Sequence, residues 1–307
     1  MPSLIEFRGV GKRYTRPLAS DIVALEDVSL DVHAGEVLGI AGPNGAGKST
    51  LISILLGYVP PSRGEVRIAN RPVREYIERH GVGYLSELVD VDPRWTVRQA
   101  LFRFGTLAGV PEARLAMRVQ EVMTRLGLDE YSDRPFRKLS KGNKQRLGLA
   151  QALLREERVL ILDEPTHGLD PLWMIRFRGI LAELRRPGRA IVVASHNLEE
   201  LERLCDRVAI LDRGRVTRVV EVGEVLPHTH ETLYRLTVAR GADRLSEVFT
   251  EATDLGRGDW AVSAPTLEAL NHGIAALIER GVLLVGVAPA QSALEQVFHD
   301  AIGEVLL

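Results

Sequence analysis

The hydrophobic and polar positions of this chain switch between the periods of strands and of helices. An unbroken apolar run at 37–41 ends at Gly42 and predicts a buried strand. Apolar positions at 48–56 recur with helical spacing and predict a helix. A strand, a glycine-rich loop and a helix are therefore expected to follow one another directly over 37–56.

The same alternation continues to about residue 222. We predict further strands at 4–8, 28–32, 64–68, 82–85, 159–162, 190–194 and 208–211. We predict helices at 97–126 with a break at 109–111, at 144–154 and at 198–204. Residues 212–215 carry the signal of a hairpin turn. Strands interleaved with helices indicate an α/β fold with a parallel sheet.

After about residue 226 the pattern changes. Residues 227–230, Pro-His-Thr-His, are interpreted as a linker. Beyond it we predict strands at 233–238, 260–263 and 282–287, and helices at 242–251, 267–279 and 291–302. The apolar run at 282–290 is predicted to be a buried strand. These elements predict two domains, 1–226 and 227–307, of which the second is a small α+β extension.

The composition is that of an ordinary globular chain. Of its 307 residues, 45% are hydrophobic and 26% are charged, which excludes a mainly disordered state. The formal net charge of −2 does not favour binding driven by bulk charge, so no nucleic-acid partner is expected. Cys205 is the only cysteine, and we expect a buried structural thiol in a reducing compartment.

Neither a membrane span nor a leader is predicted. No apolar run approaches the roughly 20 residues of a spanning helix. The N-terminus lacks the basic and then apolar pattern of a signal peptide. We therefore expect a cytoplasmic chain that is still able to dock on a membrane protein.

The glycine-rich loop fits the phosphate-loop pattern G-x-x-x-x-G-K-[ST]. Its predicted nucleotide-binding residues are Gly42, Pro43, Asn44, Gly45, Ala46, Gly47, Lys48, Ser49 and Thr50. Glycines let main-chain N–H groups approach phosphate oxygens, and the positive end of the next helix faces the bound anion. Lys48 is expected to reach the β- and γ-phosphates, and Ser49 to offer its hydroxyl to Mg²⁺.

Two carboxylates follow the apolar strand predicted at 159–162. Asp163 is expected at the carboxyl end of a parallel strand, where such sheets bind ligands, and can hold Mg²⁺ directly or through water. We interpret Glu164 as a general base that polarises a water aimed at the γ-phosphate. The alternative is a solvated acidic pair that caps the strand, and the phosphate loop favours the catalytic interpretation.

The segment Leu139-Ser140-Lys141-Gly142-Asn143 resembles the signature motif of ATP-binding cassette (ABC) ATPases, usually Leu-Ser-Gly-Gly-Gln. With the phosphate loop and the acidic pair, it makes residues 4–222 similar to the ATPase subunit of a bacterial ABC transporter. The resemblance implies a P-loop NTPase core with a helical signature subdomain at about 88–150. It also implies that Ser140 and Gly142 contact ATP held by an opposite subunit, in a head-to-tail homodimer.

Further positions match motifs of the same family. Residues 167–170 resemble the D-loop, which implies that Asp170 faces the subunit interface. The other role of Asp170 is to cap the next helix before Pro171. His196 matches the switch histidine, which bonds the γ-phosphate in the family. The resemblance thus implies three catalytic residues, Lys48, Glu164 and His196.

Two more positions concern the base and the metal of the nucleotide. Tyr14 matches the aromatic residue that stacks on adenine, although a lone tyrosine is more often an ordinary surface residue. Glu87 stands where the family usually has Gln, and the resemblance implies contact with Mg²⁺ together with Ser49 and Asp163.

The function implied by the resemblance is an ATPase that binds ATP and Mg²⁺ and powers transport. Its partner is a separate integral-membrane permease, which would hold it on the inner face of the cell membrane. Residues 292–298 resemble the C-terminal extension of bacterial exporter subunits and, with Glu87, favour export. Two alternatives stay open: a soluble ABC-type ATPase that acts on ribosomes or DNA, and a nucleotide sensor without turnover. The cargo is not predicted, because its contacts belong to the permease.

Overall fold

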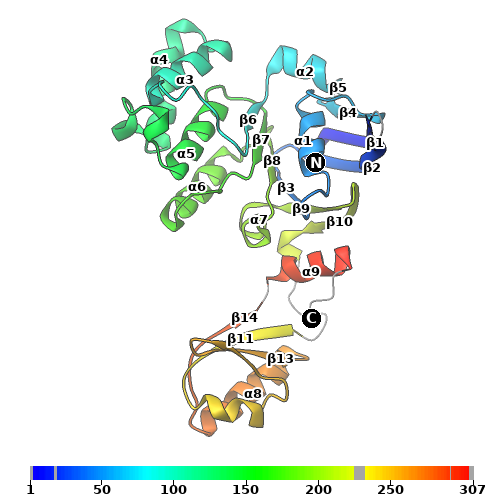
Figure 1. Ribbon diagram of the computed structural model, residues 1–307, viewed down its shortest axis with the longest axis vertical. Helices are drawn as coiled ribbons and strands as arrows, with labels where there is room; N and C mark the ends of the chain where they lie inside the picture. Colours follow the sequence, from blue (N-terminus) through cyan, green and yellow to red (C-terminus); the bar gives the residue numbers. More distant parts are fainter. Residues whose placement is uncertain (1–2, 17–18, 225–231, 291, 304–307) are drawn as a thin grey trace. The chain divides into compact units, whose positions relative to one another are not determined.

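The computed structural model describes residues 3–16, 19–224, 232–290 and 292–303. The chain folds into two compact units, Met1–Val222 and Gly223–Leu307 (Figure 1). Each unit has its own β-structure and its own buried core. The linker predicted at 227–230 lies outside the described residues.

A six-stranded sheet forms the centre of the first unit. In spatial order its strands are β10 (Arg215–Glu221), β9 (Arg207–Asp212), β3 (Val37–Ala41), β8 (Ala190–Ala194), β7 (Val159–Asp163) and β6 (Gly83–Leu85). All neighbouring pairs are parallel except β9 and β10, which form the hairpin predicted at 212–215. The parallel strands end at one edge, so the segments that follow β3, β7 and β8 meet there.

A second sheet of the first unit is antiparallel and has four strands. In spatial order they are β2 (Ala19–His33), β1 (Ser3–Arg16), β4 (Arg63–Ile68) and β5 (Arg71–Pro72). Strands β1 and β2 are much longer than the predicted 4–8 and 28–32. Their pairing continues past the half-buried part to exposed residues such as Tyr14 and Ile22, where the alternating pattern is absent.

Helices surround these two sheets. In the first unit they are α1 (Lys48–Leu55), α2 (Val73–His80), α3 (Val97–Leu107), α4 (Glu112–Arg125), α5 (Lys141–Ala152), α6 (Pro171–Leu184) and α7 (Leu198–Leu204). Short 3₁₀ turns are η1 (Asp129–Tyr131), η2 (Phe136–Lys138) and η3 (Val222–Glu224). Figure 1 shows α3, α4 and α5 grouped beside one end of the six-stranded sheet.

The predicted interruption of the helix at 97–126 is confirmed. Helix α3 starts with a capping box at Thr96 and ends at Leu107, and α4 starts after Pro111. Gly109 between them has a φ of +75°, which a glycine adopts without strain. Helix α2, by contrast, was not predicted. Only Val73 and Tyr76 of its eight residues are buried, too few to create an apolar period.

The main core of the first unit contains side chains from both sheets and from α1. Ile5 on β1, Leu38 on β3 and Ile52 on α1 are each at most 2% exposed. Burial of one such side chain stabilises the fold by about 1.5–3 kcal/mol. Because β3 and α1 share this core, the glycine-rich loop between them is anchored at both ends. Cys205 is buried, as expected, and its burial raises the pKa of the thiol.

The second unit is an α+β domain. Its antiparallel strands, in spatial order, are β12 (Thr253–Gly256), β13 (Asp259–Ala264), β11 (Thr232–Arg240) and β14 (Leu283–Pro289). Its helices are α8 (Leu267–Glu279), α9 (Ala293–Ile302) and the 3₁₀ segment η4 (Ala242–Glu247). Leu236, Val262 and Leu277 are fully buried in its core.

Two predictions for the second unit were wrong. The helix expected at 242–251 is only the 3₁₀ segment η4, and the short strand β12 that follows it was not predicted. The strand expected to be buried at 282–290 is largely exposed: Val285 is 70% and Leu283 is 55% accessible. Leu283, Val285 and Val287 are all exposed and alternate along the strand, so they lie on an uncovered face of the sheet, which an apolar run does not reveal.

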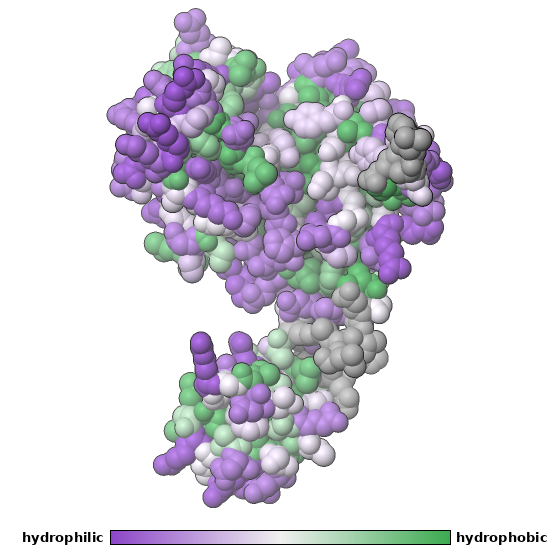
Figure 2. All heavy atoms as spheres, in the orientation of Figure 1, coloured by the Kyte–Doolittle hydropathy of each residue, from purple (hydrophilic) through white to green (hydrophobic). Residues whose placement is uncertain are grey.

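A groove of about 360 Å³ with both polar and apolar lining residues lies between the helical group and the sheet-bearing part of the first unit. Tyr58 and Leu107 line it, and they are 69% and 82% exposed. Figure 2 shows apolar patches on the helical group and on the sheet-bearing part, on either side of the groove. Among the described residues, no helix has the length and apolar character needed to cross a membrane.

Candidate functional site

The phosphate loop connects β3 to α1 at the shared edge of the parallel strands. Gly47 precedes α1 with a φ of +110°, and a Cβ there would lie 2.5 Å from the carbonyl oxygen of Ala24. A Cβ at Gly42 would lie 2.3 Å from the carbonyl oxygen of Leu211. Only glycine fits at these two positions. No side chain caps the N-terminus of α1, so its first N–H groups are available to an anion.

The side chain of Lys48 folds back onto the start of the phosphate loop. Its Nζ donates hydrogen bonds to the carbonyl oxygens of Gly42, at 2.5 Å, and of Pro43, at 3.2 Å. Burial lowers the pKa of Lys48, and the negative charges of Glu164, Asp163 and Glu87 partly offset this effect. A half-buried ammonium group held by two carbonyl oxygens can exchange them for phosphate oxygens.

Asp163 ends strand β7 and faces the same space. Its pKa is raised to about 6, first by burial and then by the negative charges of Glu164 and Glu87, while Lys48 acts in the opposite direction. The structure therefore brings Lys48 together with Glu87 and with the adjacent pair Asp163 and Glu164, which come from three separate segments of the sequence. A single ammonium group does not balance three carboxylates, which leaves the cluster able to accept a cation.

Glu164 is buried and tightly held. Its Oε1 accepts hydrogen bonds from the main-chain N of His196, at 2.9 Å, and lies 2.8 Å from His196 Nδ1. Its Oε2 accepts a hydrogen bond from Ser195 Oγ at 3.1 Å. The imidazole of His196 is largely exposed. The predicted base and the predicted switch histidine are therefore direct neighbours.

The residues predicted to reach the opposite subunit form a separate group. Ser140 and Asp170 cap α5 and α6, accepting hydrogen bonds from the main-chain N of Asn143 at 3.2 Å and of Trp173 at 2.9 Å. Gly142 lies close to Gly168: a Cβ on Gly142 would be only 2.9 Å from the carbonyl oxygen of Gly168. In the described parts of the chain, no hydrogen bond joins this group to the phosphate loop.

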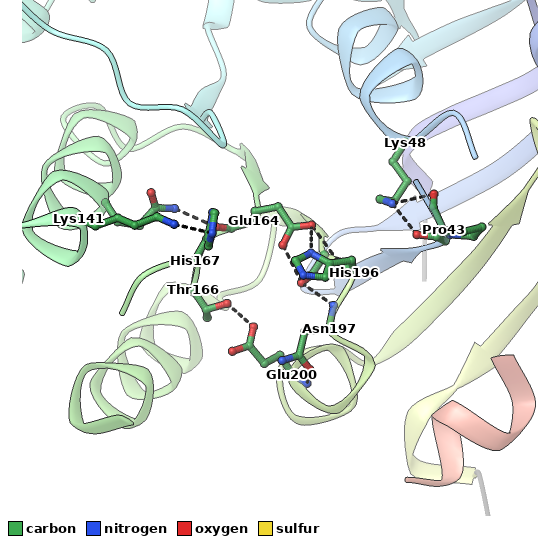
Figure 3. A network of polar contacts seen from close by, with 12 residues as sticks. Pro43, Lys48, Lys141, Glu164, Thr166, His167, His196, Asn197 and Glu200 are labelled. Carbon is green, nitrogen blue, oxygen red and sulfur yellow. Dashed lines mark hydrogen bonds and ion pairs between the residues drawn. The ribbon is translucent and has the colours of Figure 1, made fainter. Parts of the chain in front are cut away.

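Figure 3 shows the polar contacts around Glu164. Lys141 and His167 are at one end of the network and Lys48 with Pro43 at the other, with Glu164 and His196 between them. Lys141 Nζ lies 2.6 Å from His167 Nε2 and so links the signature segment to the loop after Glu164.

Tyr14 lies on the long hairpin of β1 and β2. It pairs with Ile22 across the hairpin and is 37% exposed, and Lys12 Nζ lies 5.1 Å from the centre of its ring. Two residues beyond Ile22, the carbonyl of Ala24 is packed against Gly47 of the phosphate loop. The hairpin thus holds an accessible aromatic ring beside the phosphate loop, where a base could stack on it.

The expected metal ligands fit Mg²⁺ by their chemistry. Ser49 and Glu87 are exposed and Asp163 is partly exposed. The pKa of Asp163 is raised first by burial and then by the negative charges of Glu164 and Glu87, and a bound cation would offset both effects. Within the described residues, no three His, Cys, Asp or Glu side chains form a metal cage. Mg²⁺ needs no such cage, because it is usually held by one or two carboxylates, water and phosphate oxygens.

Sequence comparison agrees with this geometry. Residues 25–167 match the family described as ABC transporter. A Nod factor export ATP-binding protein I of Burkholderia lata is 37% identical over 73% of this chain and 71% of its own length. An uncharacterized ABC transporter ATP-binding protein of Nostoc sp. is 38% identical over 67% of this chain and 62% of its own length.

The chain belongs to the ATP-binding subunits of ABC transporters.

Solved structures support the same assignment for this ABC subunit. The ATP-binding subunit of an ABC transporter superposes with a TM-score of 0.65 and 30% identity, over 73% of this chain and 92% of that one. A dimeric bacterial ABC transporter cassette superposes with a TM-score of 0.66 and 26% identity, over 71% of this chain and 98% of that one. A related dimeric cassette was solved with ADP and phosphate after hydrolysis. This subunit is therefore an ATPase that binds ATP, built on the P-loop NTPase fold.

The sequence analysis missed several residues that hold the site of this ABC subunit in place. Gln145 donates a side-chain hydrogen bond to the carbonyl oxygen of Glu164 at 2.9 Å. Thr166 Oγ1 donates to the Glu200 carboxylate and so ties the loop after Glu164 to α7. Gln145 directly follows the segment that resembles the signature motif, and Ser195 is the neighbour of His196, so both had a local signal but no assigned role. The residues at 166 and 200 carry no recognisable pattern, because their partners lie on other elements.

Proposed function

We propose that this ATPase hydrolyses ATP with Glu164 as general base, in a head-to-tail pair that drives a separate membrane permease. The observation that carries the catalytic part is the meeting of Lys48, Asp163, Glu164 and His196 at one edge of the sheet. The phosphoryl reaction needs positioning and charge neutralisation more than covalent help from the protein. These four side chains supply both.

The proposed step is an in-line attack by water. Glu164 accepts a proton as the water oxygen bonds to the γ-phosphorus, and the bond from that phosphorus to the bridging oxygen breaks, leaving ADP and inorganic phosphate. Lys48 exchanges its carbonyl contacts for phosphate oxygens. His196 holds Glu164 from the side, and its exposed ring can bond the γ-phosphate.

Ser49, Asp163 and Glu87 are the residues that we propose to hold Mg²⁺. When bound, Mg²⁺ supplies charge neutralisation to the phosphate oxygens. Glu87 in place of the usual Gln adds a negative charge, and this charge contributes to the raised pKa of Asp163. Tyr14 is the proposed platform for the adenine ring.

The pairing of two copies is supported by the separate group of signature residues. Ser140, Gly142 and Asp170 lie on or near the surface but make no hydrogen bond to the phosphate loop of their own chain in the described residues. They are therefore free to contact ATP bound to a second copy, with Ser140 at the positive end of α5. The dimeric relative of similar fold supports this proposal.

Transport through a permease is supported by the exposed apolar side chains of Tyr58 and Leu107 in the groove of the first unit. Exposed apolar side chains in a groove of this kind are typical of a docking site for another protein. Export is the proposed direction, because several curated relatives are named Nod factor export ATP-binding proteins. We therefore propose that the subunit works at the inner face of the cell membrane.

The test of this proposal is Glu164→Gln, which removes the base and keeps the size of the side chain. We expect phosphate release to fall at least about 100-fold, while ATP binding remains and an ATP-dependent dimer accumulates in size-exclusion chromatography. Glu78→Gln, at an exposed position on α2, is the matched control. Normal turnover by Glu164→Gln would contradict the assignment of the base.

A second experiment addresses the partner. The full chain, expressed at native level with a tag, is purified from detergent-solubilised membranes. Recovery of one multi-span membrane protein supports transport, and its loss in Leu107→Glu would place docking in the groove. Recovery with ribosomes instead would favour the soluble alternative.

A further inference from the structure

Gln145 is a buried polar residue for which the ATPase reaction, as described so far, has no role. It lies one turn into α5 and is only 5% exposed. Its Nε2 donates a hydrogen bond of 2.9 Å to the main-chain carbonyl oxygen of Glu164. A buried amide of this kind is costly to desolvate unless it is paired, so the contact is specific.

The main chain of Glu164 needs such support. Its φ of +48° lies in the left-handed region, which is uncommon for a residue other than glycine. Its N–H donates to the carbonyl of Ala194 at 2.9 Å, and its carbonyl accepts from the N–H of His167 at 3.1 Å and from Gln145. A strained conformation persists only where its surroundings determine it from several sides.

The direction of the Glu164 side chain depends on this conformation. With the backbone in this left-handed conformation, the carboxylate reaches Ser195 Oγ and the main-chain N of His196. Relaxation of φ to the ordinary region would swing the side chain away from the loop that follows β8. The hydrogen bond from Gln145 opposes this relaxation, because it fixes the carbonyl at the other end of the same residue.

We propose that Gln145 is a positioning residue for ATP hydrolysis, which holds the Glu164 carboxylate in the orientation that activates water. This inference rests on the proposed role of Glu164 as base. It also gives α5 a second task, since the same helix begins at Ser140, the residue proposed to contact the ATP of the other copy. A rigid helical segment then connects the opposite nucleotide to the base of this subunit.

Two further contacts make this connection stiff. Lys141 Nζ lies 2.6 Å from His167 Nε2, and the close approach of Gly142 to Gly168 leaves no room for a Cβ. The N-terminal part of α5 is therefore joined to the loop after Glu164 through Lys141 and Gly142, and to Glu164 itself through Gln145. A displacement of α5 cannot leave the Glu164 backbone unchanged.

The experiment is a double-mutant cycle with Gln145→Met and Glu164→Gln. Methionine keeps the length and volume of glutamine but has no N–H to donate. We expect Gln145→Met alone to lower kcat about 10- to 100-fold, with KM for ATP within about twofold of wild type, because misplacement of a catalytic group affects the chemical step. Gln120→Met, at an exposed position on α4, is the control and keeps its kcat.

The second arm of the cycle separates positioning from a general structural defect. In the Glu164→Gln background, single-turnover release of labelled phosphate should change less than about twofold on adding Gln145→Met, because the base on which Gln145 acts is already gone. An equal loss in both backgrounds, or an unchanged kcat in Gln145→Met alone, would overturn the inference. If Gln145→Met does not fold, Gln145→Asn replaces it. Asparagine keeps the amide but is one methylene shorter, and it should show the same loss of kcat.

These outcomes differ from a failure of the proposed function. Should Glu164→Gln itself turn over normally, Glu164 is not the base and the proposed function fails. Should Glu164→Gln be inactive while Gln145→Met is normal, only the role of Gln145 is lost. ATP-dependent dimer formation, measured on both variants, must stay intact if Gln145 acts through Glu164 alone.

Discussion

His196 Nδ1 lies 2.8 Å from Glu164 Oε1, and the main-chain N of His196 donates to the same oxygen at 2.9 Å. One residue thus contacts the carboxylate both through its ring and through its backbone. The backbone contact does not depend on the side chain. The role of the imidazole can therefore be separated from the placement of Glu164.

The first prediction concerns this imidazole. His196→Ala keeps the main-chain donor and Ser195, so Glu164 stays in place, but the ring that can bond the γ-phosphate is lost. We expect kcat for ATP hydrolysis to fall by about 10- to 100-fold, of the order found for one positioned donor. ATP affinity should change little. His272→Ala, at an exposed position on α8 of the second unit, serves as control. Full activity of His196→Ala would remove His196 from the mechanism.

The second prediction concerns Lys48. Replacement by alanine removes the ammonium group that is expected to bind the β- and γ-phosphates, and a charge-assisted hydrogen bond contributes about 1.5–3 kcal/mol. Lys48→Ala should therefore bind ATP about 10- to 100-fold more weakly in equilibrium titration. Lys138→Ala, an exposed lysine in η2, should bind as wild type does. Unchanged ATP binding by Lys48→Ala would contradict the phosphate-loop assignment.

The third prediction follows from the raised pKa of Asp163, which is about 6 against an ordinary value of 3.8. The folded chain keeps this proton to higher pH than the unfolded chain does. The contribution of Asp163 to stability is therefore greatest below pH 4 and is lost as the pH rises through about 6.

Asp163→Asn replaces the carboxylate with a neutral amide and so removes this loss of stability at higher pH. In metal-free buffer without nucleotide, it should raise the free energy of unfolding by about 2 kcal/mol at about pH 8, a figure reduced for the partial exposure of the carboxylate. The gain should fall to about half at about pH 5. Urea unfolding at both values measures it, with the exposed Asp133→Asn as control. A gain independent of pH would mean that titration of Asp163 is not its cause.

Local chemistry explains why much of the fold and site was predictable. The strand at 37–41 agrees with β3 because an unbroken apolar run ends there at Gly42, and the helices at 198–204 and 267–279 agree with α7 and α8 because of their apolar period. The phosphate loop is likewise encoded in consecutive residues. Its glycines are required by backbone positions that Gly42 and Gly47 occupy without a Cβ.

Contacts between distant elements were not predictable in the same way. The apolar run that became β14 has the composition of a buried strand, but one face of this strand is uncovered, which leaves Val285 mostly exposed. Gln145 is one polar residue in a helix until the fold places the Glu164 carbonyl 2.9 Å from it. Neither the exposure of Val285 nor the hydrogen-bond partner of Gln145 can be predicted from the residues next to them in the sequence.

By itself, the sequence determined that this protein binds a nucleotide phosphate, where many of its helices and strands lie, and which carboxylates are candidates for catalysis. Only the tertiary structure decided that Lys48, Asp163, Glu164 and Glu87 share one electrostatic site, and that Glu164 is held by Ser195, His196 and Gln145. The physical reason is the distance along the chain over which each interaction acts. Backbone geometry and periodicity act between near neighbours in the chain, whereas burial, charge coupling and a strained φ depend on what the sheet brings together.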